Sequence, residues 1–198
     1  MKKNNTGQFI GILLAAGKGA RFDPSGAQDK LLQPLASGEP IAVAAARNLL
    51  AVLPSVLAVV RPGADALAAQ LRALGCEVTE CPAAAQGMGA SLVHALSQTR
   101  DAAAWVIALA DMPFVLPGTI AALRDAISHG ADIAVPVCQG RRGNPVAFSR
   151  KHLDRLLQLG GDQGARSLLT SFPVIEVAVD DAGICQDIDR AADLEKLK

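Results

Sequence analysis

The sequence has no excess of charge of either sign, and that absence narrows the class of partner. Its 198 residues hold 19 Lys and Arg against 19 Asp and Glu. Proteins that wrap nucleic acid or coat an anionic membrane usually present a positive surface. The sequence therefore favours a small-molecule partner and predicts neither nucleic-acid nor membrane binding.

Paired cysteines are also lacking. Cys76, Cys81, Cys138 and Cys185 are scattered, with no Cys-x-x-Cys spacing that would place two thiolates on one zinc ion. We interpret them as reduced structural thiols. A zinc site is the alternative, but it needs ligand spacing that is missing here.

No signal peptide is recognisable at the amino end. Residues 1–7 are polar, and the apolar run that follows them is short and contains glycine. Repeats and low-complexity tracts are absent as well. We expect a cytoplasmic protein with a flexible tail at residues 1–7 and a single domain over residues 8–198.

Short apolar runs alternate with segments rich in Ala and Leu. The runs are too continuous for a sheet with one wet face, and strands that are buried on both faces have this pattern in parallel α/β sheets. The pattern predicts a three-layer α/β/α sandwich with a mostly parallel sheet. Strands are expected at 9–15, 56–60, 103–110, 131–137, 144–149 and 173–180, and helices at 41–53, 64–74, 90–98, 117–128, 151–158, 165–170 and 190–197.

The loop after the first strand looks like a phosphate-binding loop but fits neither standard motif. Gly11 is one residue too far from the Gly-Lys pair for a Walker A loop, and Gly19 replaces its hydroxyl residue. A dinucleotide fingerprint would need a third glycine where Phe22 stands. Both standard loop types are therefore disfavoured.

Small residues and two cations remain in this loop. Small side chains let phosphates approach backbone N–H groups, while Arg21 offers a guanidinium fork and Lys30 a point charge. Two cations around one nucleotide suit nucleotidyl transfer, in which negative charge spreads over the α-phosphorus and the leaving pyrophosphate. A flexible glycine loop with two solvated cations is the alternative interpretation.

A carboxylate follows the strand expected at 103–110. Ligands of open α/β sheets bind beyond the carboxyl ends of the strands, so Asp111 is placed to hold Mg²⁺ against a triphosphate. Capping of the next helix is the alternative role, but that helix begins several residues later, near Pro117.

Six segments in register resemble the molybdenum cofactor cytidylyltransferase and guanylyltransferase family. They are LLAAGKGARF with DKLLQPL, then GMGASL, LADMPF, RRGNPVAF, GDQGAR and QDIDRAADL. The resemblance implies a Rossmann-like nucleotide-diphospho-sugar transferase sandwich that joins an NTP to an acceptor phosphate and releases pyrophosphate. It further implies Mg²⁺ as cofactor, CTP and molybdopterin as substrates, and a molybdenum hydroxylase as the enzyme that receives the product.

The resemblance also assigns roles to residues. Arg21, Lys30 and Asp111 are expected to be catalytic, and Asp111 is expected to share the metal with Asp187 or Asp189, which the sequence leaves as equal alternatives. Ser91 is expected in the first turn of its helix, either facing the nucleotide or as the N-cap. Expected nucleotide contacts are Leu14, Ala15, Ala16, Gly17, Gly19, Gly87, Gly89 and Ser91, and expected acceptor contacts are Arg142, Asn144, Asp162 and Arg166.

The sequence departs from the family pattern in two places. FDPSGAQD lengthens the loop between Arg21 and Lys30, so this loop must bulge to bring Lys30 to the site. Cytidylyl-type members often carry His where Asn144 stands, which leaves the identity of the acceptor open.

The residue at position 16 bears on the choice of base. Guanylyl enzymes tend to have Gly at the position of Ala16, and a methyl group there could favour cytosine over a purine.

Three other functions remain as alternatives. The acceptor could be a sugar phosphate or methylerythritol phosphate instead of molybdopterin. The protein could be a non-catalytic carrier of molybdenum cofactor, although a carrier needs no metal-binding acid beside a triphosphate loop. An NAD-dependent oxidoreductase is disfavoured by the missing third glycine.

Overall fold

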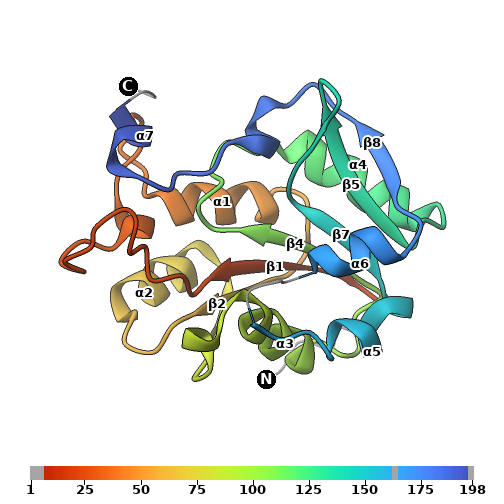
Figure 1. Cartoon of the computed structure of the whole chain (residues 1–198), viewed down its shortest axis with the longest axis horizontal. Helices are drawn as coiled ribbons and strands as arrows, with labels where there is room; N and C mark the ends of the chain where they lie inside the picture. Colours follow the sequence, from red (N-terminus) through yellow and green to blue (C-terminus); the bar gives the residue numbers. More distant parts are fainter. Residues whose placement is uncertain (1–6, 162–164, 196–198) are drawn as a thin grey trace.

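The protein is built on a central eight-stranded sheet with helices on both faces, seen in a computed structural model that describes residues 7–161 and 165–195 (Figure 1). The strand order is β3-β2-β1-β4-β7-β5-β6, and β8 pairs with β5. Neighbours among β1 to β4 pair in parallel, whereas β7 runs antiparallel between β4 and β5. The strands are β1 (Phe9–Ala15), β2 (Val56–Val60), β3 (Glu77–Glu80), β4 (Ala104–Leu109), β5 (Ile133–Cys138), β6 (Arg141–Arg142), β7 (Val146–Ser149) and β8 (Ile175–Ala178).

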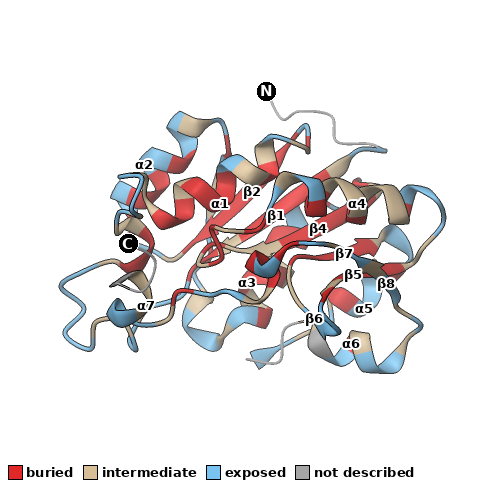
Figure 2. Ribbon diagram, turned by 90° about the horizontal axis from the view of Figure 1, so that it is seen from above, coloured by how far each residue is buried: buried red, intermediate tan, exposed pale blue. Residues whose placement is uncertain are grey.

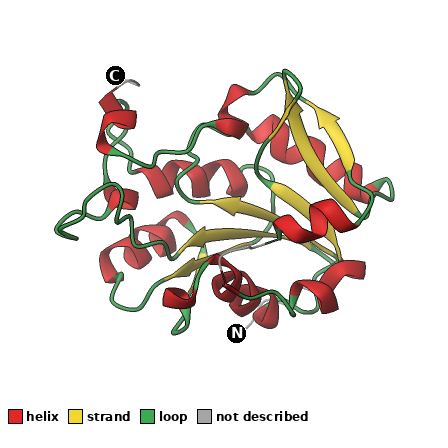
Figure 3. Ribbon diagram, viewed as in Figure 1, coloured by secondary structure: helices red, strands yellow, loops and turns green. Residues whose placement is uncertain are grey.

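Helices form the two outer layers (Figures 2 and 3). In the view of Figure 2, α1, α2 and α4 cover one face of the sheet, and α3, α5 and α6 cover the other. The helices are α1 (Ile41–Leu50), α2 (Asp65–Leu74), α3 (Met88–Gln98), α4 (Pro117–Ser128), α5 (Leu153–Leu156), α6 (Arg166–Ser171) and α7 (Ala191–Glu195), with 3₁₀ turns η1 (Lys30–Leu32), η2 (Ala84–Gln86), η3 (Arg150–His152) and η5 (Ala182–Cys185).

Alternating residues of β1 supply both halves of the core. Ile10 and Ile12 are buried with Leu92 of α3, while Leu13 is buried on the opposite face with Ile41 of α1. Successive side chains of a strand point to opposite faces, so an unbroken apolar run is what a strand between two helical layers requires. The predicted three-layer sandwich is confirmed.

The prediction missed β3 and β6. β3 is the polar segment Glu-Val-Thr-Glu, which pairs with β2 at the end of the strand order and so lies at the edge of the sheet with much of its surface exposed. Edge strands need no apolar run, because one flank and part of each face meet water. β6 has only two residues and pairs with β5 across a tight turn.

Several expected boundaries shift. Helix α3 begins at Met88, two residues before the expected start, and α1 ends at Leu50 instead of residue 53. The helix expected at 151–158 is the short turn η3 followed by α5. No helix within residues 7–161 and 165–195 combines the length and the apolarity that crossing a membrane would require. Residues 1–6 of the expected tail lie outside the described residues.

Candidate active site

The loop after β1 turns at Gly19 and folds against Lys30. Gly19 has φ +64°, in the left-handed region that glycine tolerates best. A Cβ at Gly19 would lie 3.2 Å from Cβ of Lys30, so this position is also crowded. Gly17, by contrast, is exposed, and a Cβ built on it meets open space. Backbone groups near Gly17 are therefore approachable from outside.

The extra residues before Lys30 form an organised turn. The Asp23 carboxylate accepts hydrogen bonds from the Ser25 hydroxyl at 2.6 Å, the Ser25 N–H at 2.9 Å and the Gln28 N–H at 2.8 Å. These bonds, led by that of the Ser25 hydroxyl, hold the pKa of Asp23 below its usual value. The segment projects at the left of Figure 1 and is followed by η1, whose N-cap is Asp29.

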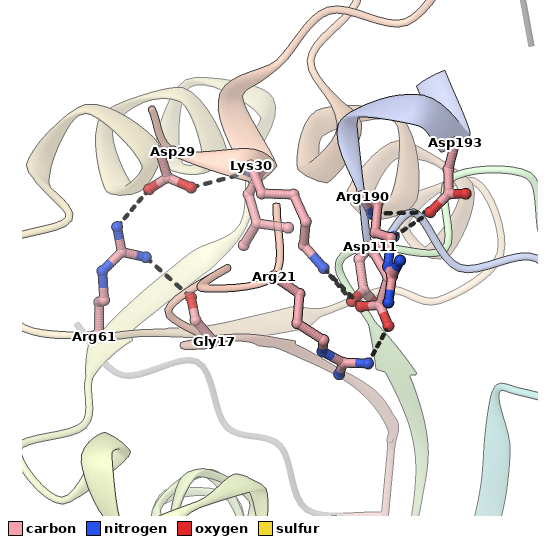
Figure 4. Close-up of polar contacts among 10 residues, drawn as sticks. Gly17, Arg21, Asp29, Lys30, Arg61, Asp111, Arg190 and Asp193 are labelled. Carbon is pink, nitrogen blue, oxygen red and sulfur yellow. Dashed lines mark hydrogen bonds and ion pairs between the residues drawn. The ribbon is translucent and has the colours of Figure 1, made fainter. Parts of the chain in front are cut away.

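Four charged side chains meet beyond the carboxyl ends of β1 and β4, and we call Arg21, Lys30, Asp111 and Asp189 the charged quartet. Lys30 Nζ lies 2.7 Å from Asp111 Oδ2 and 3.5 Å from Asp189 Oδ1. Arg21 Nη1 lies 2.6 Å from Asp189 Oδ2. Figure 4 shows the side chains of Lys30 and Arg21 converging on the Asp111 region from the same side. The structure thus brings together four residues to which the sequence assigned catalytic or metal-binding roles, and those roles stay predictions.

The members of the quartet differ in burial. The Lys30 side chain is only 10% exposed, whereas the Arg21 side chain is 74% exposed. The carboxylates are about one quarter exposed, at 25% for Asp111 and 27% for Asp189. The Lys30 side chain is therefore largely covered by the protein, while Arg21 has room to change its rotamer when a ligand arrives.

The extended segment before α7 distinguishes Asp187 from Asp189. The Ile188 N–H donates to the Asp111 carbonyl at 2.9 Å, and the Ile188 side chain is buried in the core. Asp189 reaches Lys30 and Arg21, while Asp187 is exposed. Asp193 Oδ2 accepts from the Asp189 N–H at 3.1 Å, which ties this segment to α7.

Sequence reasoning missed Arg61 and Asp29. Arg61 Nη2 lies 2.7 Å from Asp29 Oδ2, and its Nη1 donates to the Gly17 carbonyl at 3.2 Å (Figure 4). Asp29 Oδ1 accepts from the Leu31 N–H at 3.0 Å and so caps η1. The sequence did contain a signal for Arg61, because this residue directly follows the buried strand β2, at the carboxyl end of the strand, where ligands of open α/β sheets bind.

The glycines before α3 have distinct positions. Gly87 is the N-cap of α3, so the alternative that Ser91 caps this helix is wrong. Ser91 is only 3% exposed, inside the helix, and its expected contact with the nucleotide stays a prediction. Gly89 packs against the loop at 160–161, where an added Cβ would lie 2.8 Å from the Gly161 carbonyl oxygen.

Of the expected acceptor residues, the structure describes the polar contacts of Arg142 and Asn144. Arg142 of β6 pairs with Glu176 of β8 at 2.7 Å, and the Asn144 N–H donates to the Ile184 carbonyl at 2.9 Å. These polar contacts are not with the charged quartet. Asp162 lies outside the described residues, and Arg166 is described only as the first residue of α6. Their role in acceptor binding stays a prediction.

A divalent cation would fit the two carboxylates. Asp111 and Asp189 each present an oxygen to the Lys30 ammonium, so both face one point. Mg²⁺ is often held by one or two carboxylates, with water and substrate phosphates as its other ligands. Within residues 7–161 and 165–195, no group of three or more His, Cys, Asp or Glu side chains forms a metal site. The free cysteines Cys76, Cys81 and Cys138 are buried.

Comparison with known proteins identifies a family and a curated relative that match most of this chain. The MobA-like NTP transferase domain family matches residues 11–177. The bifunctional protein GlmU of Rhodospirillum rubrum is 30% identical over 145 residues, which is 70% of this chain and 30% of GlmU. The chain thus spans less than a third of the length of that curated relative.

Solved structures agree with the family match. Rv0371c of Mycobacterium tuberculosis is 28% identical and superposes with a TM-score of 0.78 over 97% of both chains, and it has also been solved in complex with manganese. A nucleotidyl transferase from Methanothermobacter, Mth528, is 21% identical with a TM-score of 0.81, covering 96% of this chain and 95% of its own. At that identity the second likeness concerns the fold alone.

Proposed function

Because the chain belongs to the MobA-like NTP transferase domain family, we propose that the charged quartet is the active site at which it transfers the cytidylyl group of CTP to molybdopterin. The observation that carries the proposal is the position of Lys30. Its ammonium lies between Asp111 and Asp189, beyond the carboxyl ends of the strands, where open α/β proteins bind ligands. Nucleotidyl transfer uses such a combination of cations beside the phosphates and acids that can bind a metal ion.

The reaction needs no side-chain nucleophile. An oxygen of the acceptor phosphate attacks the α-phosphorus of the nucleotide, and the bond from this phosphorus to the β-phosphate oxygen breaks. Pyrophosphate leaves with the electron pair. The acceptor phosphate is already an anion, so no general base has to remove a proton.

Arg21 and Lys30 would stabilise the charge that develops. Lys30 is nearly buried, so its ammonium would act on the phosphates in a poorly solvated setting. Arg21 is exposed and can turn from Asp189 towards the triphosphate. Leu14, Ala15, Ala16, Gly17 and Gly19 would line the triphosphate, and Gly87, Gly89 and Ser91 the nucleoside.

Asp111 and Asp189 are the proposed ligands of Mg²⁺. The cation would neutralise triphosphate oxygens and help to orient the leaving group. The solved manganese complex of Rv0371c supports a divalent cation in this fold. Asp187, which is exposed, is not proposed as a ligand.

Acceptor and base selectivity are finer parts of the proposal. Arg142, Asn144, Asp162 and Arg166 are the proposed acceptor contacts, and a molybdenum hydroxylase is the proposed recipient of the product. Ala16 is the proposed selector of cytosine, although only 7% of it is exposed. Ala16→Gly should narrow the preference for CTP over GTP. An unchanged ratio of kcat/KM for the two nucleotides would refute the steric explanation.

Pyrophosphate release tests the proposed function. CTP, GTP and ATP are supplied in turn with Mg²⁺, with and without molybdopterin, to the wild type and to Asp111→Ala. Release that requires CTP, molybdopterin and Asp111 is the expected result. Release with a sugar phosphate or methylerythritol phosphate instead would change the acceptor, and tight molybdopterin binding without any release would favour a carrier.

A further inference from the structure

Arg61 links two segments of the site that are far apart in the sequence. It is the first residue after β2, and its guanidinium bonds to the Gly17 carbonyl at 3.2 Å and to Asp29 Oδ2 at 2.7 Å. Gly17 belongs to the loop after β1, and Asp29 immediately precedes Lys30. Both partner side chains are largely covered, at 28% exposed for Arg61 and 16% for Asp29.

The two carboxylate oxygens of Asp29 have different partners. Oδ2 pairs with Arg61, and Oδ1 accepts from the Leu31 N–H at 3.0 Å. Its carbonyl accepts from the Leu32 N–H at 3.2 Å. Arg61 therefore holds Asp29, the residue that caps the turn η1 carrying Lys30.

Holding the Gly17 carbonyl also orients a donor. In a planar trans peptide, the C=O and the following N–H point in opposite directions. With the Gly17 carbonyl directed at Arg61, the Lys18 N–H is directed away from it. Arg61 thereby fixes the direction of one backbone donor in the loop proposed to bind phosphates.

We propose that Arg61 is a positioning residue for nucleotidyl transfer, which holds the loop after β1 and the Lys30 turn as one unit. It acts through Gly17 and Asp29 and does not itself touch the nucleotide. The inference rests on the proposed function, because it gives Lys30 a role in turnover. A guanidinium is suited to this bridge, since its planar fork donates to two acceptors at fixed angles.

Amide hydrogen exchange tests the bridge without any substrate. The variants are Arg61→Met, which removes the fork, and Asp29→Asn, which keeps an oxygen for the η1 cap but loses the charge. Arg47→Met is the matched control, because Arg47 pairs with Glu39 away from the quartet. We expect exchange to accelerate about tenfold over residues 16–33 in both site variants, and not in the control. Unchanged exchange in Arg61→Met would overturn the proposal.

Steady-state kinetics test whether Arg61 acts through Lys30. Arg61→Met should lower kcat about 10- to 100-fold, the cost of a small misplacement of catalytic groups, with a smaller change in KM for the nucleotide. In a Lys30→Met background, the same substitution should change kcat by less than about threefold, because residues acting as a unit are non-additive. Arg61→Lys should recover part of the loss.

The kinetic outcomes separate the two proposals. Multiplicative losses in the double variant would mean that Arg61 acts independently of Lys30, which overturns the inference. Full turnover by Lys30→Met alone would instead refute the proposed role of Lys30. If the wild type turns over no nucleotide, the proposed function fails, and the exchange measurement still decides whether Arg61 positions the loop.

Discussion

Lys30 and Asp111 are 81 residues apart in the sequence, yet Lys30 Nζ and Asp111 Oδ2 lie 2.7 Å apart in the structure. The same ammonium lies 3.5 Å from Asp189, whose other oxygen pairs with Arg21. Two cations thus balance two carboxylates before any substrate arrives. A nucleotide that draws Lys30 and Arg21 to its phosphates would leave both carboxylates free for a metal ion.

We therefore expect metal and nucleotide to bind cooperatively. Mn²⁺ alone should bind the wild type weakly, because it must displace the Lys30 ammonium, and a bound nucleotide should tighten Mn²⁺ binding about tenfold or more. Lys30→Met should bind Mn²⁺ alone more tightly than the wild type does. Titrations followed by electron paramagnetic resonance measure free Mn²⁺ directly. Weaker Mn²⁺ binding by Lys30→Met would contradict this account.

The neighbouring acids Asp187 and Asp189 form a natural matched pair. Asp189→Asn removes a carboxylate that faces Lys30 and Arg21, so we expect kcat/KM to fall about 100-fold or more, as when other preorganised charges are lost. Asp187→Asn changes an exposed side chain and should stay within about twofold of the wild type. Pyrophosphate release gives both values. Equal losses in the two variants would show that the segment rearranges during turnover.

Most of the fold could be predicted because its strands are buried on both faces. β1 and β2 match the expected limits, since each is an unbroken apolar run between turn residues. β3 could not be found in this way, because its polar side chains sit at the edge of the sheet. The sequence also indicated that the site lies in the loops beyond the carboxyl ends of the strands, because ligands of open α/β sheets bind there.

The other contacts of the site depend on the course of the loops, which local sequence patterns do not determine. The contact between Arg61 and Asp29 requires the extra residues after Arg21 to fold back at one particular point, which the hydrogen bonds of Asp23 help to define. The sequence did not decide which of Asp187 and Asp189 reaches the site, because alternate residues of an extended segment point to the same face and either face could be the inner one. In the structure the buried residue of this segment is Ile188, which lies between them.

The turn centred on Asp23 should be separable from catalysis. Asp23→Ala removes the acceptor of three hydrogen bonds, so amide exchange should accelerate over residues 22–28. Asp29 and Arg61 stay intact, so we expect kcat to fall less than about threefold. Exchange and kinetics on the same variant test both statements. A loss as large as that of Arg61→Met would mean that the extra residues themselves hold Lys30.

His152 should make stability depend on pH. It is only 5% exposed and packs edge-on against Phe172, and its Nδ1 finds no hydrogen-bond partner within the described residues. Burial, the main cause, lowers the pKa of His152 below its usual value of 6.5, with a smaller lowering from Arg155 that Asp132 opposes.

The direction of this effect follows from proton binding. Because the folded pKa is the lower one, the unfolded chain takes up the proton first as the pH falls below about 6.5. The contribution of the neutral imidazole is therefore present above that pH and is lost on acidification, with a slope of at most about 1.4 kcal/mol per pH unit. Urea unfolding between pH 7.5 and 5 should show a shallower loss in His152→Phe than in the wild type. His129→Gln is the control for removing an imidazole, because His129 is exposed. If the free energy of unfolding changes with pH by the same slope in the wild type and in His152→Phe, His152 is excluded as the cause.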